Sequence, residues 1–110
     1  MDTNTTKDDD ELGGSASKKL QDMLAAADRY ALDRLKLLCA SKLQKKISGD
    51  TVASTLACAQ MYNCPELKKK CIDFFANEKN FKKVVLTDGF VQLVYEFPSV
   101  LAELREKVGA

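Results

Sequence analysis

The sequence contains no histidine among its 110 residues, and it has only two prolines and five glycines. Without histidine, the chain lacks the residue that enzymes use most often as a general acid or base, and also the most common neutral metal ligand. The scarcity of proline and glycine leaves long stretches free to be helical. We therefore expect a largely helical protein that is poorly equipped for acid–base catalysis.

Several sequence signals are also missing. No apolar run approaches the roughly 18 residues of a membrane span, and no basic segment followed by an apolar one marks a secretory signal at the N-terminus. We therefore expect an intracellular protein of the nucleus or cytoplasm, with reduced thiols and no membrane partner. Glycine-rich phosphate loops and pairs of carboxylates at a catalytic spacing are absent too, so we predict no enzymatic activity and no cofactor.

Charge is unevenly distributed along the chain. Residues 1–18 carry five acidic and two basic residues, whereas the other 92 residues carry 15 basic and 11 acidic ones, a net charge of +4. The first 18 residues also have almost no apolar side chains to offset the entropy lost on ordering. We predict a disordered acidic N-terminal tail over residues 1–18.

Lysines cluster at positions 68–70, 79, 82 and 83. They could meet phosphate or an acidic partner, but such a pattern more often marks a solvated helix face. The net charge of +4 is also too small to indicate nucleic acid by itself. We therefore expect no nucleic acid partner.

From residue 19 onward, apolar residues recur every three or four positions, which is the spacing of one buried face on an amphipathic helix. The pattern predicts an all-α fold of about six helices and no strand. The first helix ends near Arg29, and the stretch from residue 80 to residue 86 favours a single helical turn. Later helix starts are marked by capping residues or prolines: Ser48 to Asp50, Pro65, Thr87 or Asp88, and Pro98.

An internal repeat with an offset of 32 residues relates two helix–corner–helix units. Leu24, Ala25, Ala27, Tyr30, Leu35, Lys36 and Cys39 recur as Leu56, Ala57, Ala59, Tyr62, Leu67, Lys68 and Cys71. We predict stacked antiparallel helical hairpins, with Tyr30 and Leu67 among the buried residues. A free-standing tetratricopeptide-like scaffold is an alternative, although such arrays need at least three units and only two are visible.

The four cysteines fit this repeat better than they fit a metal site. Cys39 and Cys71 occupy equivalent positions, and Cys58 replaces Ala26 at a small core site. Structural zinc sites use close ligand pairs, whereas 18, 5 and 6 residues separate these thiols. We expect no metal. Cys64 keeps a claim to reactivity, because the dipole at a helix N-terminus favours the thiolate.

The string MLAAADRYALDRLKLLCASKL, residues 23–43, closely resembles the last two helices of a BTB/POZ domain in the MATH-BTB family. The segment from Ser48 to about Asn77 resembles the 3-box of that family, and Phe90 to Val108 resembles its BACK region, in a plant-like form. The resemblance implies a tail (1–18), two BTB-type helices (19–47), a 3-box-like hairpin (48–78) and BACK-like C-terminal helices (79–110).

Members of this family are substrate adaptors of cullin-3 RING ubiquitin ligases. The resemblance implies a non-catalytic interaction module with cullin-3 as a partner and with a homodimer or higher oligomer as its assembly. The cullin-binding candidates are Asp50, Thr51, Thr55, Met61 and Tyr62. The self-association candidates are Val94, Phe97, Val100, Leu101 and Leu104. The chain has no counterpart of the MATH domain or of the BTB strands, so we expect either an excised C-terminal region or a truncated product. In a truncated product, the faces around Leu24 and Leu35 should expose apolar surface that favours association.

Overall fold

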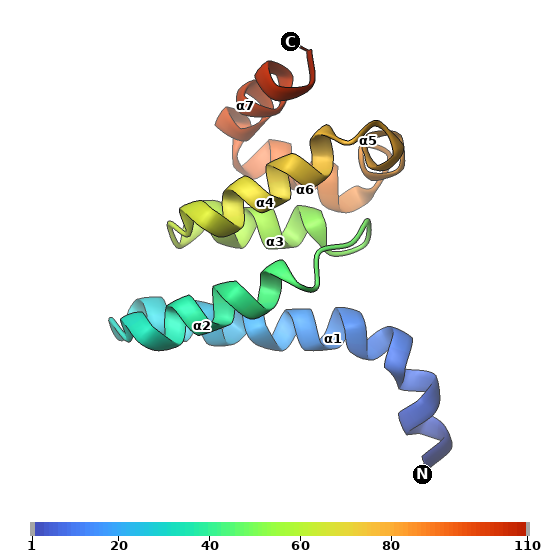
Figure 1. The fold of residues 1–110 in the computed structure, drawn as a ribbon, viewed down its shortest axis with the longest axis vertical. Coiled ribbons are helices and arrows are strands. Elements are labelled where there is room, and N and C mark those ends of the chain that lie inside the picture. The colour runs from blue at the N-terminus through green and yellow to red at the C-terminus, as the bar shows by residue number, and fades with distance from the viewer. Residues whose placement is uncertain (1, 110) are drawn as a thin grey trace.

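The structure, a computed structural model, describes the backbone of residues 2–109 and the side chains of residues 16–77 and 79–108. Seven α-helices and no strand occur in this described backbone (Figure 1). The predicted all-α class is therefore confirmed. The helices are α1 (Asp2–Arg29), α2 (Asp33–Gln44), α3 (Val52–Met61), α4 (Pro65–Ala76), α5 (Glu78–Val84), α6 (Asp88–Glu96) and α7 (Pro98–Gly109).

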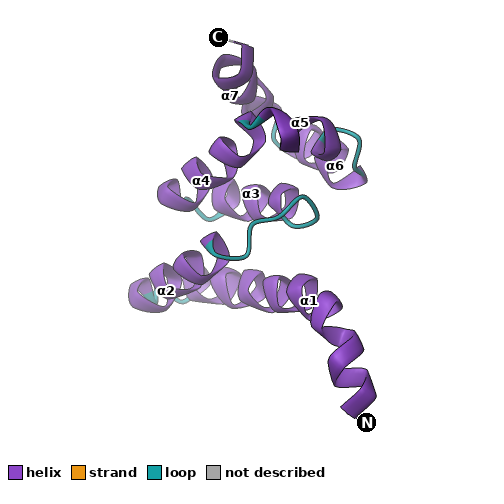
Figure 2. Cartoon of the chain, turned by 45° about the vertical axis from the view of Figure 1, so that its right-hand side comes forward, coloured by secondary structure: helices purple, strands orange, loops and turns teal. Residues whose placement is uncertain are grey.

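The helices stack as antiparallel hairpins. The first hairpin is α1 with α2, and the second is α3 with α4; each forms one layer of the molecule in Figure 1. Beyond the second hairpin, α6 and α7 pack against each other, and α5 leads into this pair, as the turned view in Figure 2 shows. Helix α4 lies at the centre, because it contacts α2, α3, α5 and α7.

Helix α4 forms where the sequence marks it. Pro65 occupies its first turn, where the missing amide donor costs nothing. Leu67, Cys71 and Phe75 recur every four residues and are all buried, so they form one apolar face. The ring of Phe75 also packs against the ring of Phe90 on α6, with centroids 5.7 Å apart. One face of α4 thus joins the second hairpin to the C-terminal helices.

The 32-residue repeat exists in the folded chain, in the core and at the corners. The equivalent pairs Leu24 and Leu56, Ala27 and Ala59, Cys39 and Cys71, and Leu43 and Phe75 are all buried. The predicted core role of these four pairs is therefore confirmed. Leu67, which the sequence places among the buried residues, is fully buried as well.

The two hairpin corners also repeat in their backbone conformation. Ala31 and Asn63 are 32 positions apart and are the described non-glycine residues with positive φ, at 55° and 56°. In both corners the next amide donates to the carbonyl five residues back: Leu32 to Ala27 at 2.8 Å, and Cys64 to Ala59 at 2.9 Å. This is the Schellman arrangement, in which a left-handed residue ends a helix and satisfies its last carbonyls.

The helix count exceeds the prediction by one, because residues 78–84 form α5 rather than a single turn. Asn77 caps this helix, since its Oδ1 accepts a hydrogen bond from the Lys79 amide at 3.0 Å. The predicted cap of the next helix is confirmed, because Oγ1 of Thr87 accepts from the Phe90 amide at 3.2 Å. A Cβ added to Gly89 would lie 3.3 Å from Cβ of Ala53, so glycine allows α6 to approach α3 closely.

Residues 2–18, which we predicted to be a disordered tail, continue helix α1 in the structure. Figure 1 shows the first turns of α1 extending away from the hairpin stack. Of the five acidic residues in this segment, Asp2 lies in the first turn of α1, where the helix dipole favours negative charge.

Two predictions about burial are wrong. Tyr30 is 67% exposed rather than buried, because it lies in the corner between α1 and α2, where helical periodicity no longer fixes the direction of a side chain. The exposure expected around Leu24 and Leu35 in a truncated chain is not found either: Leu24 is fully buried, as its place in the repeat predicts, and Leu35 is half-buried against the core. The cause is that α1 packs against both α2 and α3.

Replacing Leu67 with alanine should lower the free energy of unfolding by roughly 2–5 kcal/mol, because the deletion leaves a cavity at a fully buried site. Tyr30→Ala should lower it by less than about 1 kcal/mol, because the tyrosine is exposed. Chemical denaturation followed by circular dichroism measures both values. Equal losses in the two variants would contradict these assignments.

Candidate partner-binding surfaces

Two of the five cullin-binding candidates are buried threonines. Thr51 precedes α3, and its Oγ1 donates to the Lys46 carbonyl at 2.8 Å and accepts from the Ser48 amide at 2.9 Å. Thr55 is 1% exposed, and its Oγ1 accepts from Nε2 of Gln21 on α1 at 3.5 Å. The first threonine organises the turn before α3, and the second joins α3 to α1.

The other three cullin-binding candidates lie at the surface, at the two ends of α3. Asp50 is exposed just before the helix begins. Met61 ends the helix and is 55% exposed, and the half-buried Tyr62 follows it. Because α3 has 10 residues, its ends are about 15 Å apart. The structure therefore brings Met61 and Tyr62 together and leaves Asp50 at a distance.

The five self-association candidates divide in the same way. Val100 and Leu104 are buried on the inner face of α7 and belong to the core. Val94, Phe97 and Leu101 are half-buried, so part of each side chain is available at the surface. Only these three can contribute to an interface without unfolding the chain.

Exposed apolar side chains on α6 extend that surface, and sequence reasoning missed them. Val91 is 60% and Tyr95 is 83% exposed, and they stand four residues apart on one side of the helix. The buried side of α6 was identified from Phe90, Leu93 and Val94, which left these two residues without a role. Their spacing of four residues was the signal in the sequence that could have identified this second apolar side of the helix.

The first hairpin also exposes apolar residues that were not singled out. They are Met23 on α1, Leu32 at the corner, and Leu37 and Leu38 on α2. None belongs to the repeated core positions. The exposed apolar surface that we expected on this hairpin is therefore present, but it is formed by these residues rather than around Leu24 and Leu35.

Ion pairs connect neighbouring helices. Nζ of Lys68 on α4 lies 2.8 Å from a carboxylate oxygen of Glu103 on α7, and Lys107 on α7 lies 3.4 Å from Asp73 on α4. In the first hairpin, Lys36 on α2 lies 2.8 Å from Asp28 on α1. Lys68, predicted to point to solvent, therefore braces α7 against α4.

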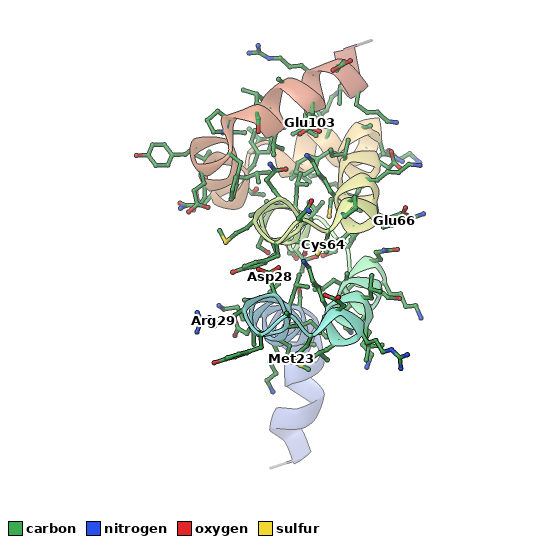
Figure 3. All side chains as sticks on the ribbon, turned by 90° about the vertical axis from the view of Figure 1, so that its left-hand side faces the viewer. Met23, Asp28, Arg29, Cys64, Glu66 and Glu103 are labelled. Atoms are coloured by element: carbon green, nitrogen blue, oxygen red, sulfur yellow. The ribbon has the colours of Figure 1, made fainter. Side chains whose placement is uncertain are left out.

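The four cysteines are free thiols, and three of them are buried. Burial raises the pKa of the Cys71 thiol to about 12 and that of Cys58 to about 11. Figure 3 shows Cys64 between the two hairpins. Burial raises the pKa of its thiol as well, against the opposing effect of Lys36. A raised pKa leaves less thiolate at neutral pH, so burial works against the reactivity that the position of Cys64 at a helix N-terminus suggested.

Two further observations bear on the kind of site. Among the side chains that the structure describes, no three histidine, cysteine, aspartate or glutamate residues are grouped so that they could hold a metal ion. Within residues 2–109, none of the helices is both long enough and apolar enough to cross a membrane. What the described surface offers is apolar and charged patches on helices, which suit contacts with other proteins.

Comparison with known families agrees with this picture. The sequence model of the family described as BPM/SPOP, BACK domain, matches residues 51–105, which is half of the chain. The chain belongs to this family. The matched range begins at the N-terminus of α3 and ends within α7. This BACK match therefore covers most of both segments that we predicted as 3-box-like and BACK-like.

Two relatives in Arabidopsis thaliana extend the similarity toward the N-terminus. BTB/POZ and MATH domain-containing protein 3 is 41% identical over 96 residues, which cover 87% of this chain and 24% of the relative. BTB/POZ and MATH domain-containing protein 4 is 45% identical over 98 residues, which cover 88% of this chain and 21% of the relative. The resemblance to MATH-BTB proteins is confirmed, and the BACK-family chain spans less than a quarter of the length of these relatives.

The buried thiol of Cys71 should make the stability of this BACK-family chain fall at alkaline pH. Its pKa rises from 9.0 to about 12 on folding, so its contribution is complete below pH 9 and is lost as the pH rises toward 12. At pH 10 the loss from this thiol should be on the order of 1 kcal/mol relative to pH 7.5. Chemical denaturation at the two pH values measures it.

The Cys71→Ala variant should show a smaller difference between pH 7.5 and pH 10 by that amount, whatever its absolute stability. Leu67→Ala is the control, because it opens a cavity in the same face of α4 without removing an ionisable group. If both variants change the pH dependence equally, the assignment to Cys71 fails.

Proposed function

We propose that this chain is a non-catalytic interaction module of a substrate adaptor for a cullin-3 RING ubiquitin ligase. The observation that carries the proposal is the BACK-family match over residues 51–105, which follows directly after the MATH-BTB-like string of residues 23–43. The alternative of a tetratricopeptide-like scaffold rested on the 32-residue period. That period is accounted for by two equivalent hairpins within the BACK-family chain.

The cullin contact is proposed at the corner side of the two hairpins. Figure 1 shows both corners on the same side of the stack. Tyr30 is exposed at the first corner, and Met61 with Tyr62 lies at the second. These side chains offer an apolar and aromatic surface that the core does not use, which suits an apolar segment of a partner.

The test is calorimetric titration of the chain with the N-terminal segment of a cullin-3. Met61→Lys should weaken binding at least tenfold, because it places a charge in the proposed apolar contact. Met23→Lys is the matched control, since Met23 is a similarly exposed methionine on the first hairpin, and it should change the affinity less than twofold. Full-length BTB/POZ and MATH domain-containing protein 3 serves as the comparison protein.

Two results would contradict the cullin contact. One is an equal loss of affinity in the two methionine variants. The other is binding by the full-length relative together with no binding by this chain, which would show that residues outside the chain are required for the contact.

Self-association is proposed through α6 and α7. Val94, Phe97 and Leu101 are half-buried, and the exposed Val91 and Tyr95 lie on α6 beside them. Together these side chains leave apolar surface exposed on the monomer, and contact with a second copy of the chain would bury it. Through this surface the chain would form a dimer or a higher oligomer.

Leu101→Asp should lower the mass measured by light scattering to that of the monomer, because it introduces a charge into the proposed interface. Leu86→Asp is the matched control, because Leu86 is 85% exposed and lies outside α6 and α7. It should leave the mass of the assembly unchanged. A monomeric mass for the unmodified chain would overturn the proposal, and circular dichroism establishes that both variants fold.

A further inference from the structure

A groove between α5 and the C-terminal part of α7 combines an apolar floor with a rim of lysines. It has a volume of about 630 Å³ and is lined by Ala76, Lys79, Phe81, Lys82, Lys83 and Val108. We call it the basic groove. A smaller cleft of about 230 Å³ shares Phe81 and Val108 with it, and adds Phe90, Leu101, Leu104 and Arg105. Because they share two residues, the groove and the cleft form one continuous apolar floor.

The positive charge of this groove is not neutralised by the side chains that the structure describes. Lys79, Lys82, Lys83 and Arg105 are all exposed. Among the described residues, no carboxylate lines either cavity, and none of these four cations forms an ion pair. Elsewhere on the molecule, lysines that face a neighbouring helix do have carboxylate partners, as Lys68 has in Glu103. The groove is therefore a concentrated positive rim around apolar surface.

We propose that the basic groove docks an acidic, amphipathic peptide segment of a partner protein. Apolar side chains of that segment fill the floor at Phe81 and Val108, and its carboxylates meet Lys79, Lys82 and Lys83. Each exposed ion pair contributes little by itself, so affinity depends on several pairs acting together with apolar burial. The proposal does not rest on the cullin contact, which lies at the corners of the other two layers.

The apolar floor of the groove favours an acidic amphipathic peptide over other anionic ligands. A nucleic acid backbone would use the lysines but would leave the floor uncovered. The chain's own acidic run has the right charge, but residues 2–12 contain a single apolar side chain, Leu12, which is too little to fill the floor of a second copy's groove. An amphipathic acidic segment satisfies both features at once.

The test uses fluorescence anisotropy with the full chain and a labelled twelve-residue peptide in which aspartates and glutamates surround two leucines and one phenylalanine. Binding should weaken as salt rises, because exposed charge pairs are screened. The triple variant Lys79→Gln, Lys82→Gln, Lys83→Gln should lose about tenfold in affinity. The matched control is Lys42→Gln, Lys45→Gln, Lys46→Gln, which removes the same charge from exposed lysines at the end of α2. It should change affinity less than twofold.

Other probes separate the alternatives. An acidic peptide of the same length without apolar residues, a peptide of residues 2–12 of this chain, and a double-stranded oligonucleotide should each bind at least tenfold more weakly than the amphipathic probe. Equal or tighter binding of any of them would overturn the proposal, as would an equal loss in the two triple variants or no binding of the amphipathic probe. Circular dichroism of both triple variants checks that the exposed substitutions leave the fold intact.

Discussion

The burial of one face of α4 is the constraint on which the rest of the structure depends. Leu67, Cys71 and Phe75 are inaccessible to solvent, and four other helices contact the helix that carries them. A domain of this size buries a modest share of its surface, so few residues supply most of its hydrophobic stabilisation. The surface ion pairs from α4 to α7 add little energy, and α7 is held mainly by Val100 and Leu104, which are buried in the same core.

This arrangement separates the packing residues from those available to partners. The repeated positions point into the stack, where small side chains such as Ala27, Ala59 and the two equivalent cysteines let the helices approach each other. Apolar residues outside the repeat remain at the corners, on α2 and on α6. The charged rim of α5 is a third kind of surface. The chain thus has room for more than one partner, because the corners of the two hairpins lie on different layers from the surfaces of α5, α6 and α7.

The sequence predicted the fold well where one face of a helix is buried. The repeat identified Leu24, Cys39, Leu56 and Cys71 as equivalent core residues, and proline and threonine marked helix starts correctly, because these signals act over a few residues. It failed at Tyr30, whose direction is set by a corner, and it did not reveal that the thiol of Cys64 is buried. Both outcomes depend on packing between layers, which one hairpin does not specify.

For the candidate sites, the type of a residue in the sequence predicted its exposure less well than its location in the folded structure does. Thr51 and Thr55 resemble surface polar residues in the sequence, but their hydroxyls are used inside the chain. Val91 and Tyr95 were overlooked because helical periodicity identifies the buried face of a helix. It does not indicate which of the exposed residues are available to bind a partner. The basic groove requires α5 and α7 to meet, although the sequence places their contributing residues more than twenty positions apart.

The two Schellman corners have a consequence for how the chain folds. Each corner reverses the backbone within a few residues, so the helices of a hairpin are close neighbours along the chain. Proteins dominated by such local contacts close short loops first and fold in microseconds to milliseconds. We therefore expect each hairpin to form as a local unit before the layers dock on one another through α4.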